Sequence, residues 1–193
     1  MTTERIIIGI SGASGITYGI RLLQLLKTLP IETHLIMSKS AEITMAYESD
    51  LKVSDVKKLA DVNHNINDIA ACLSSGSYKT RGMIIAPCSI RSMSEISTGV
   101  TSSLLTRAAD VILKERRKLI LMVRETPLHT GHLRTLVNLS EIGAIIAPPV
   151  PAFYAKPDSL EEMVDYTLGR VLDMLDIEID GMNRWDENSK KRP

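Results

Sequence analysis

The sequence predicts a doubly wound parallel α/β sheet in three layers, with helices on both faces of the sheet. Two observations support this fold class. Short apolar runs rich in β-branched residues alternate with longer stretches whose apolar residues recur at helical spacing. The runs are continuously apolar rather than alternating, which is typical of strands that are buried on both faces of a parallel sheet.

The first strand is expected over residues 6–10, and a helix follows from about Ile16 until Pro30 stops it. A second strand is expected at 33–37. Two further helices are expected at 41–47 and 53–60. Residues 61–81 have weak periodicity and many Asn, Asp and Ser residues, so we expect a long surface excursion with little regular structure.

The second half of the chain is expected to continue the alternation. Its predicted elements are strands at 82–86, 119–123 and 144–147, and helices starting at Ser89, over 102–117, over 131–139 and after Ser159. No internal repeat or linker divides the chain, so a single domain over 1–193 is expected, with a polar tail from about residue 180.

Composition excludes several classes of protein. The chain has 193 residues, 44% of them hydrophobic, and its 23 basic and 23 acidic residues give a formal net charge of zero. A nucleic-acid binder would usually be basic, and the 4% of aromatic residues offers few platforms for base stacking. Zero net charge also leaves little repulsion against self-association.

The sequence predicts a cytoplasmic protein without a membrane span. No apolar run reaches the length of a transmembrane helix, and a signal-peptide pattern is not found. The two cysteines, Cys72 and Cys88, form no C-x-x-C motif and no metal-ligand cluster, and they fit a reducing compartment. A small buried residue is the preferred interpretation of Cys88, because no histidine has an obvious position to activate it as a nucleophile.

The loops that leave the predicted strands are expected to form the functional site. In doubly wound sheets, ligands bind outside the carboxyl ends of the strands. Serines in these loops can donate to a phosphate or a polar ring, although a serine at a helix start is usually only a cap. The loops are 11–15, 38–40, 87–92, 124–127 and 148–154, and the serines are Ser14, Ser38, Ser89 and Ser92.

The first of these loops, Ser11-Gly12-Ala13-Ser14-Gly15, suggests a phosphate site. Its small residues allow close approach to the backbone, and the following helix would offer unpaired N–H groups at its positive end. However, the spacing is not G-x-G-x-x-G, and the lysine of a Walker A motif is missing. A tight turn that binds nothing is the alternative.

Several charged residues have both a functional and a purely structural interpretation. Arg124 suits a phosphate or carboxylate, and the adjacent Glu125 suits proton transfer, but the two could simply pair on the surface. Lys114 is most simply part of a solvated helix end. His129 and His132 are expected to be capping or surface residues, so no metal site is predicted there.

Taken together, these residues resemble the UbiX-like flavin prenyltransferases, a family whose members are also called phenolic-acid decarboxylases. The likeness covers almost the whole chain apart from residues 61–81. The matching stretches are GISGASGITYGIRLL (9–23), SKSA (38–41), APCSIRSMSEISTG (86–99), LLTRAADVILKERRKLILMVRETPLH (104–129) and PAFYAKP (151–157).

The resemblance implies an enzyme, a prenyltransferase with a flavodoxin-like or Rossmann-like fold. It would join the dimethylallyl group of dimethylallyl monophosphate to reduced FMN, without a metal. The product, prenylated FMN, is the cofactor of UbiD-like aromatic-acid decarboxylases. The resemblance also implies a homododecamer with active sites at the junctions between its chains. It leaves open whether the decarboxylase serves ubiquinone synthesis or the breakdown of phenolic acids.

The resemblance also assigns roles to residues of this chain. Ser14 and Glu125 match the proton-transfer pair, and Glu48 matches a further acidic residue of the site. Residues that match FMN contacts are Gly12, Ala13, Ser14, Ser38, Ser89, Ile90, Arg91, Ser92 and Arg124. Residues that match the prenyl-phosphate site or its surroundings are Arg107, Lys114, Arg124, Tyr154, Arg170 and Trp185.

This chemistry suits the side chains present. Expulsion of phosphate leaves an allyl cation, so lysine and arginine side chains are needed to hold the leaving group. The segment Ser-Ile-Arg-Ser-Met after Cys88 departs from many relatives, and Arg91 could reach either the flavin or solvent. Two alternatives are a flavin-dependent cysteine decarboxylase, whose characteristic motifs are not found, and a non-catalytic protein that binds FMN and delivers it to a decarboxylase.

Overall fold

The computed structural model describes residues 4–179 and divides the chain into two compact units, 1–149 and 150–193. The first unit contains the sheet. The second contains a short 3₁₀ helix, η2 (Phe153–Ala155), and the helix α7 (Leu160–Asp173). A single domain spanning both units stays a prediction, and the predicted polar tail lies outside the described residues.

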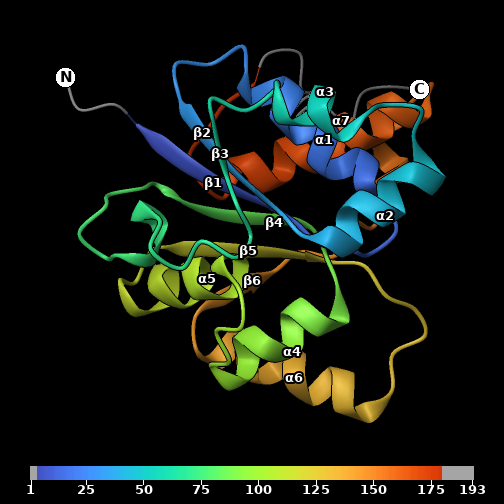
Figure 1. The fold of residues 1–193 in the computed structure, drawn as a ribbon. Helices are drawn as coiled ribbons and strands as arrows, with labels where there is room; N and C mark the ends of the chain where they lie inside the picture. Colours follow the sequence, from blue (N-terminus) through green and yellow to red (C-terminus); the bar gives the residue numbers. More distant parts are fainter. Residues whose placement is uncertain (1–3, 180–193) are drawn as a thin grey trace. The chain divides into compact units, whose positions relative to one another are not determined.

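The first unit is built on six parallel strands in the order β3-β2-β1-β4-β5-β6 (Figure 1). The strands are β1 (Arg5–Ile10), β2 (Glu32–Met37), β3 (Val62–His64), β4 (Gly82–Cys88), β5 (Lys118–Val123) and β6 (Ala144–Ile146). The predicted doubly wound parallel sheet is therefore confirmed. From β1 the chain continues to β2 on one side of the sheet, and from β4 it continues to β5 on the other side. The switch point of the topology, where a ligand crevice is expected, therefore lies between the carboxyl ends of β1 and β4.

Strand β3 was not predicted from the sequence, because little regular structure was expected over residues 61–81. Its three residues, Val62-Asn63-His64, pair only with β2 at the edge of the sheet. The segment is too short and polar to produce an apolar strand pattern. The other five strands follow the flavodoxin-like order, and β3 extends it to the order 3-2-1-4-5-6 of Rossmann folds.

The helices of the first unit cover both faces of the sheet. Figure 1 shows α1, α2 and α3 on one face and α4, α5 and α6 on the other, as predicted. Their bounds are α1 (Ile16–Leu26), α2 (Lys39–Glu48), α3 (Val53–Lys57), α4 (Ile90–Thr98), α5 (Leu104–Lys114) and α6 (Thr130–Glu141). A second 3₁₀ helix, η1 (Cys72–Ser74), lies in the segment between β3 and β4.

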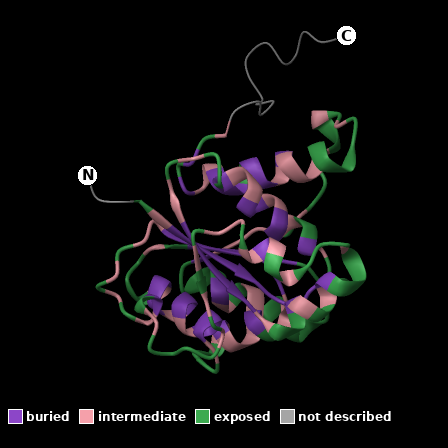
Figure 2. Ribbon diagram, turned by 45° about the horizontal axis from the view of Figure 1, so that its top comes forward, coloured by how far each residue is buried: buried purple, intermediate pink, exposed green. Residues whose placement is uncertain are grey.

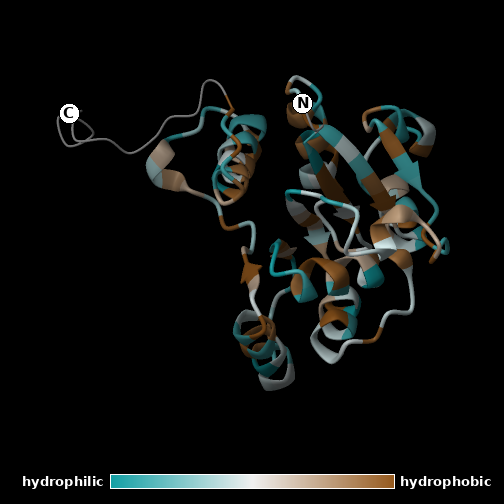
Figure 3. Ribbon diagram, turned by 90° about the vertical axis from the view of Figure 1, so that its left-hand side faces the viewer, coloured by the Kyte–Doolittle hydropathy of each residue, from teal (hydrophilic) through white to brown (hydrophobic). Residues whose placement is uncertain are grey.

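The core explains why these segments form these elements. Strands β1, β2 and β5 are buried apart from their first residues, and β4 is buried over its whole length, whereas the edge strands β3 and β6 are mostly half-buried (Figure 2). Figure 3 shows hydrophobic residues on strands of the sheet and on parts of the helices. Five buried residues of α5 pack on one face of the sheet: Leu104, Leu105, Ala108, Ala109 and Ile112.

Helix α5 is shorter than the predicted 102–117. Ser103 and Thr106 form a reciprocal capping box that fixes its start. At its end, Arg117 turns away to donate to the carbonyl oxygens of Gly76 and Tyr78, at 2.6 and 2.9 Å. Arg117, which was expected to be part of a solvated helix end, therefore also holds the segment between β3 and β4 in place. Within residues 4–179, no helix is long and apolar enough to cross a membrane.

Candidate active site at the carboxyl edge of the sheet

The loop after β1 is tied to the loop after β4. The hydroxyl of Ser11 is buried, donates to the carbonyl of Pro87 at 2.9 Å and accepts from the amide of Ser89 at 2.7 Å. The amide of Ser11 also donates to Pro87. One serine thus holds together the two loops that flank the switch point, as the predicted shared crevice requires.

Gly12 lies where no side chain fits. A Cβ atom at this position would come within 2.3 Å of Ser40 Cβ and 3.0 Å of the Ser40 backbone carbon, so the loop packs directly against the start of α2. Gly15, the N-cap of α1, has a φ of 97°, a conformation that favours glycine. Ala13 between them is buried. The small residues of the loop therefore reflect close packing as well as any ligand.

The N-terminus of α1 is occupied by a side chain of the protein. Glu48, the last residue of α2, accepts hydrogen bonds from the amides of Gly15 and Ile16 at 2.8 and 3.0 Å. The expectation that these N–H groups are unpaired is therefore wrong. A carboxylate takes the place proposed for a phosphate because an anion is stabilised at the positive end of a helix.

Glu48 joins Ser14 and Arg124 in one charged cluster. Partial burial acts to raise the pKa of Glu48, but hydrogen bonds from the Ser14 side chain and the two amides, with the nearby Arg124 charge, lower it below its usual value. The carboxylate therefore stays ionised. The structure thus brings three predicted site residues together, from the ends of β1, α2 and β5.

Tyr18 belongs to the same cluster and was not selected from the sequence. Burial raises the pKa of its hydroxyl, and the Arg124 charge opposes that shift. The tyrosine is therefore a neutral hydroxyl close to the guanidinium. The matched stretch 9–23 contained this residue, but no motif distinguished it from a residue of the helix surface.

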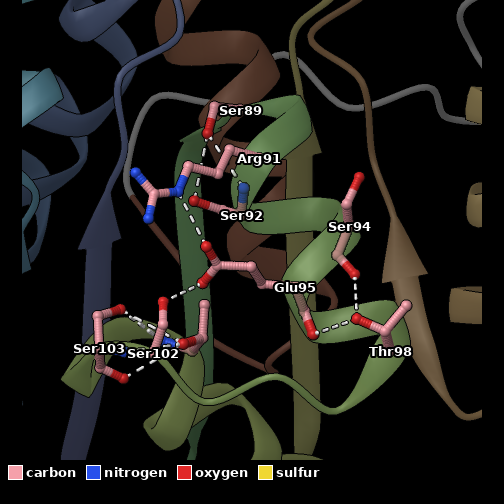
Figure 4. A network of polar contacts seen from close by, with 9 residues as sticks. Ser89, Arg91, Ser92, Ser94, Glu95, Thr98, Ser102 and Ser103 are labelled. Carbon is pink, nitrogen blue, oxygen red and sulfur yellow. Dashed lines mark hydrogen bonds and ion pairs between the residues drawn. The ribbon is translucent and has the colours of Figure 1, made fainter.

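The predicted serines at the other strand ends are helix caps. Ser38 accepts from the amide of Ala41 at 3.1 Å and begins α2. Ser89 accepts from the amide of Ser92 at 3.3 Å, and its hydroxyl lies 3.2 Å from that of Ser92, as Figure 4 shows. The caps fix hydroxyl groups along the crevice, so the capping role and a ligand role are compatible.

Arg91 points away from this row of hydroxyls. Its Nε lies 2.9 Å from Glu95 Oε1, and its side chain is 80% exposed (Figure 4). Ile90 packs against the core instead. The proposed flavin contacts of residues 89–92 thus rest on Ser89 and Ser92 in this structure, while a contact from Arg91 would require it to leave Glu95.

Glu125 lies next to the cluster in sequence and is exposed, and its Oε1 accepts from the amide of Thr126 at 3.0 Å. His129 caps α6, with its Nδ1 accepting from the amides of Gly131 and His132 at 3.0 and 3.4 Å. The capping interpretation of His129 is confirmed. Burial raises the pKa of the Cys88 thiol to about 12, which fits a structural residue better than a nucleophile.

Two predicted cations lie on α5, and one of them, Lys114, is at the opposite edge of the sheet. Lys114 ends α5, four residues before β5 begins, and pairs with Glu115 at 2.5 Å. Arg107, further back on α5, pairs with Asp110 at 2.8 Å and donates to the carbonyl of Ser74. Because Arg124 follows the far end of β5, one chain does not bring Lys114 and Arg124 together.

The second unit contains two more predicted site residues, Tyr154 and Arg170. Tyr154 and Tyr166 share a hydrogen bond of 2.7 Å with their rings edge to face. Burial and this hydrogen bond raise the pKa of Tyr166 to about 12, opposed by the nearby charge of Arg170. Arg170 itself pairs with Asp173 at 2.8 Å. Trp185 lies outside the described residues.

The parallel sheet, with its switch point between β1 and β4 and helices on both faces, defines a flavodoxin-like α/β protein. The Flavoprotein family matches residues 1–172. The flavin prenyltransferase UbiX of Escherichia coli K12 is 55% identical over 185 residues, covering 94% of this chain and 98% of that protein. That of Thauera aromatica is 50% identical, covering 97% and 96%.

Solved structures agree with these relatives. A structure described as AnUbiX (PadA1) in complex with FMN and dimethylallyl pyrophosphate matches with a TM-score of 0.94 and 48% identity, covering 96% of this chain and 98% of that one. A dodecameric FMN-dependent UbiX-like decarboxylase from Escherichia coli O157:H7 matches with a TM-score of 0.92 and 45% identity, covering 94% and 99%. The chain belongs to the UbiX flavin prenyltransferase family, as its motifs predicted.

Proposed function

We propose that this chain transfers the dimethylallyl group of dimethylallyl monophosphate to reduced FMN, and that the prenylated FMN serves a UbiD-like aromatic-acid decarboxylase. The observation that carries this proposal is the cluster of Ser14, Glu48 and Arg124 at the switch point of the sheet. Its members are residues that the family resemblance selects, and they come from three separate elements.

The carboxyl edge fits FMN. Hydroxyls of Ser38, Ser89 and Ser92 lie at strand ends, and Arg124 adds a guanidinium suited to a phosphate ester. Gly12 removes the bulk of a side chain beside them. The α1 amides are taken by Glu48, so these hydroxyls and the Arg124 guanidinium are the groups proposed to hold the FMN phosphate and ring.

Different residues of the proposed site are assigned to different steps of prenyl transfer. Reduced FMN supplies an electron-rich ring that attacks the dimethylallyl carbon, so no protein nucleophile is needed. Lys114, Arg124, Tyr154 and Arg170 are proposed to hold the donor phosphate, with Arg107 as a basic neighbour. Glu125, with Ser14, is proposed to move protons for the departing phosphate and the flavin. Cations take over the charge neutralisation that Mg²⁺ provides in many phosphoryl sites, so no metal is invoked.

The separation of Lys114 from Arg124 supports an active site shared between copies of the chain. The six residues of β5 lie between them, roughly 20 Å at the rise of a strand. A lysine from a second copy would complete the phosphate clamp. The dodecamer described for the Escherichia coli O157:H7 relative supports a homododecamer here, and a cytoplasmic location is proposed with it.

The decisive experiment needs no decarboxylase. Purified protein is incubated with reduced FMN and either dimethylallyl monophosphate or the pyrophosphate, and the flavin is analysed by mass spectrometry. The proposal expects an FMN adduct with one five-carbon prenyl unit from the monophosphate. If neither donor gives an adduct, the chain is a non-catalytic FMN carrier.

A further inference from the structure

Three metal-ligating side chains meet outside the proposed active site. They are His34 on β2, His64 on β3 and Cys72 in η1, and their ligand atoms all lie within 4.8 Å of one another. His34 is only 1% exposed, His64 is half-buried and Cys72 is exposed. All three lie in the first unit, next to Glu32 and Arg5, the first residues of β2 and β1.

The orientation of His34 is fixed by a carboxylate. His34 Nε2 lies 2.9 Å from Glu32 Oε1, and Arg5 Nε donates to the same oxygen at 2.8 Å. A proton on Nε2, directed at Glu32 Oε1, leaves the lone pair of Nδ1 directed away from Glu32. Metal-binding histidines commonly have such a carboxylate partner.

The lone pair of His34 Nδ1 is directed at His64. The atoms His34 Nδ1 and His64 Nε2 are 2.9 Å apart. In a tetrahedral zinc site, with Zn–N bonds of about 2.0–2.1 Å, two nitrogen ligands lie about 3.3 Å apart. An ion would replace the proton that the two rings share.

We propose that His34 Nδ1, His64 Nε2 and the thiolate of Cys72 form a site for one divalent ion of the zinc type. Two imidazoles and a thiolate suit a borderline-soft ion better than Mg²⁺ or Ca²⁺, which prefer oxygen ligands. Because Cys72 is exposed, solvent supplies both an entry path and a water molecule for the fourth position. The sequence predicted no metal site at His129 and His132 and no ligand cluster at the cysteines, and this proposal departs from it at Cys72.

The ion would fasten the segment between β3 and β4 to the edge of the sheet. In the present structure the later part of that segment is held by Arg107 at Ser74 and by Arg117 at Gly76 and Tyr78. Cys72 lies before these contacts, and its bond to the ion would join η1 to β2 and β3. The proposed role is structural, independent of prenyl transfer.

The test uses Co²⁺ as a spectroscopic probe. The full chain is dialysed against a chelator under reducing conditions and titrated with Co²⁺, followed by competition with Zn²⁺. The expected result is about one equivalent bound per chain, with the near-ultraviolet charge-transfer band of a cobalt–thiolate bond and displacement by Zn²⁺. Uptake well below one equivalent, or binding without the thiolate band, would overturn the proposal.

Variants separate this site from other ligands of the chain. Cys72→Ser should remove the thiolate band, and Glu32→Gln should weaken binding about 10–100-fold. Cys88 is still present in Cys72→Ser, so a band that persists there comes from Cys88 and contradicts the proposal. His132→Asn is the matched control and should bind Co²⁺ like the natural chain. Circular dichroism confirms that each variant is folded.

Discussion

The two edges of the sheet hold their polar groups in different ways. At the carboxyl edge, side chains bond mainly to backbone amides, as Glu48 does at the start of α1 and as Ser38 and Ser89 do at theirs. At the amino edge, side chains bond to one another, as in the chain from Arg5 through Glu32 and His34 to His64. The first edge is therefore organised by side chains that satisfy backbone amides, and the second by side chains that pair with one another across neighbouring strands.

The largest effect is expected from a substitution that removes proton transfer at the carboxyl edge. Glu125→Gln keeps the shape of the side chain but removes its ability to exchange a proton, so FMN should still bind while turnover falls about 10²–10⁴-fold. Single-turnover mass spectrometry of the prenylated product measures the rate. Glu161→Gln, an exposed glutamate in the first turn of α7, is the matched control. Normal turnover in Glu125→Gln would remove this residue from the mechanism.

The next test asks whether the amino edge is independent of that chemistry. Zn²⁺ at about 100 times its dissociation constant should stabilise the chain by about 2.7 kcal/mol, if the unfolded chain does not bind it. Thermal unfolding with and without Zn²⁺ measures this, and Cys72→Ser should show a much smaller change. Prenyl transfer should be the same with and without Zn²⁺. A parallel change in the rate of transfer would mean that the two edges are coupled.

Gly12→Ala tests the close packing of the first loop against Ser40. The new methyl group would overlap the Ser40 side chain, and we expect a loss of about 1–3 kcal/mol in the free energy of unfolding together with weaker FMN binding. Urea unfolding and a fluorescence titration with FMN measure both. Adding Ser40→Gly removes the nearest contact and should restore part of the loss. No rescue would mean that the Ser40 backbone, which a Cβ atom at position 12 would also approach to 3.0 Å, requires the glycine.

The smallest expected effect is that of Glu48→Gln. Loss of the charge at the start of α1 should reduce stability by about 0.3–1 kcal/mol at neutral pH. Since the pKa of Glu48 is lower in the folded chain than its ordinary value of 4.5, its stabilisation is present above that value and is lost as the pH falls through the folded-state pKa. Urea unfolding at neutral and acid pH should show the variant and the natural chain converging in acid.

The same contrast explains what the sequence could predict. Sheet, helices and caps follow from local patterns, so all the strands except β3 and the caps at Ser38, Ser89 and Ser159 were predictable. The pairing of Glu48 with the start of α1 joins residues 33 positions apart, and no spacing rule reveals it. The cluster of His34, His64 and Cys72 depends on the register of β2 with β3, a strand too short to recognise.

The family resemblance identified some site residues that local sequence patterns do not reveal, but it did not predict how they are arranged. It selected Ser14, Glu48 and Arg124 without any knowledge of their contacts, and the structure brings them together. It also selected Lys114, which the fold of one chain places at the other edge of the sheet, and Arg107, which lies further back on the same helix. Residues that work across a boundary between copies carry no signature in the pattern of a single chain.

The position of Glu48 has a consequence for product release. Because its carboxylate satisfies the first amides of α1, the loop from Ser11 to Gly15 keeps its shape without any bound anion. A binding site that is organised in advance loses little conformational freedom when the flavin enters. The same loop has no need to collapse when the bulky product leaves. A built-in carboxylate thus suits the proposed role, in which the protein releases prenylated FMN to another enzyme.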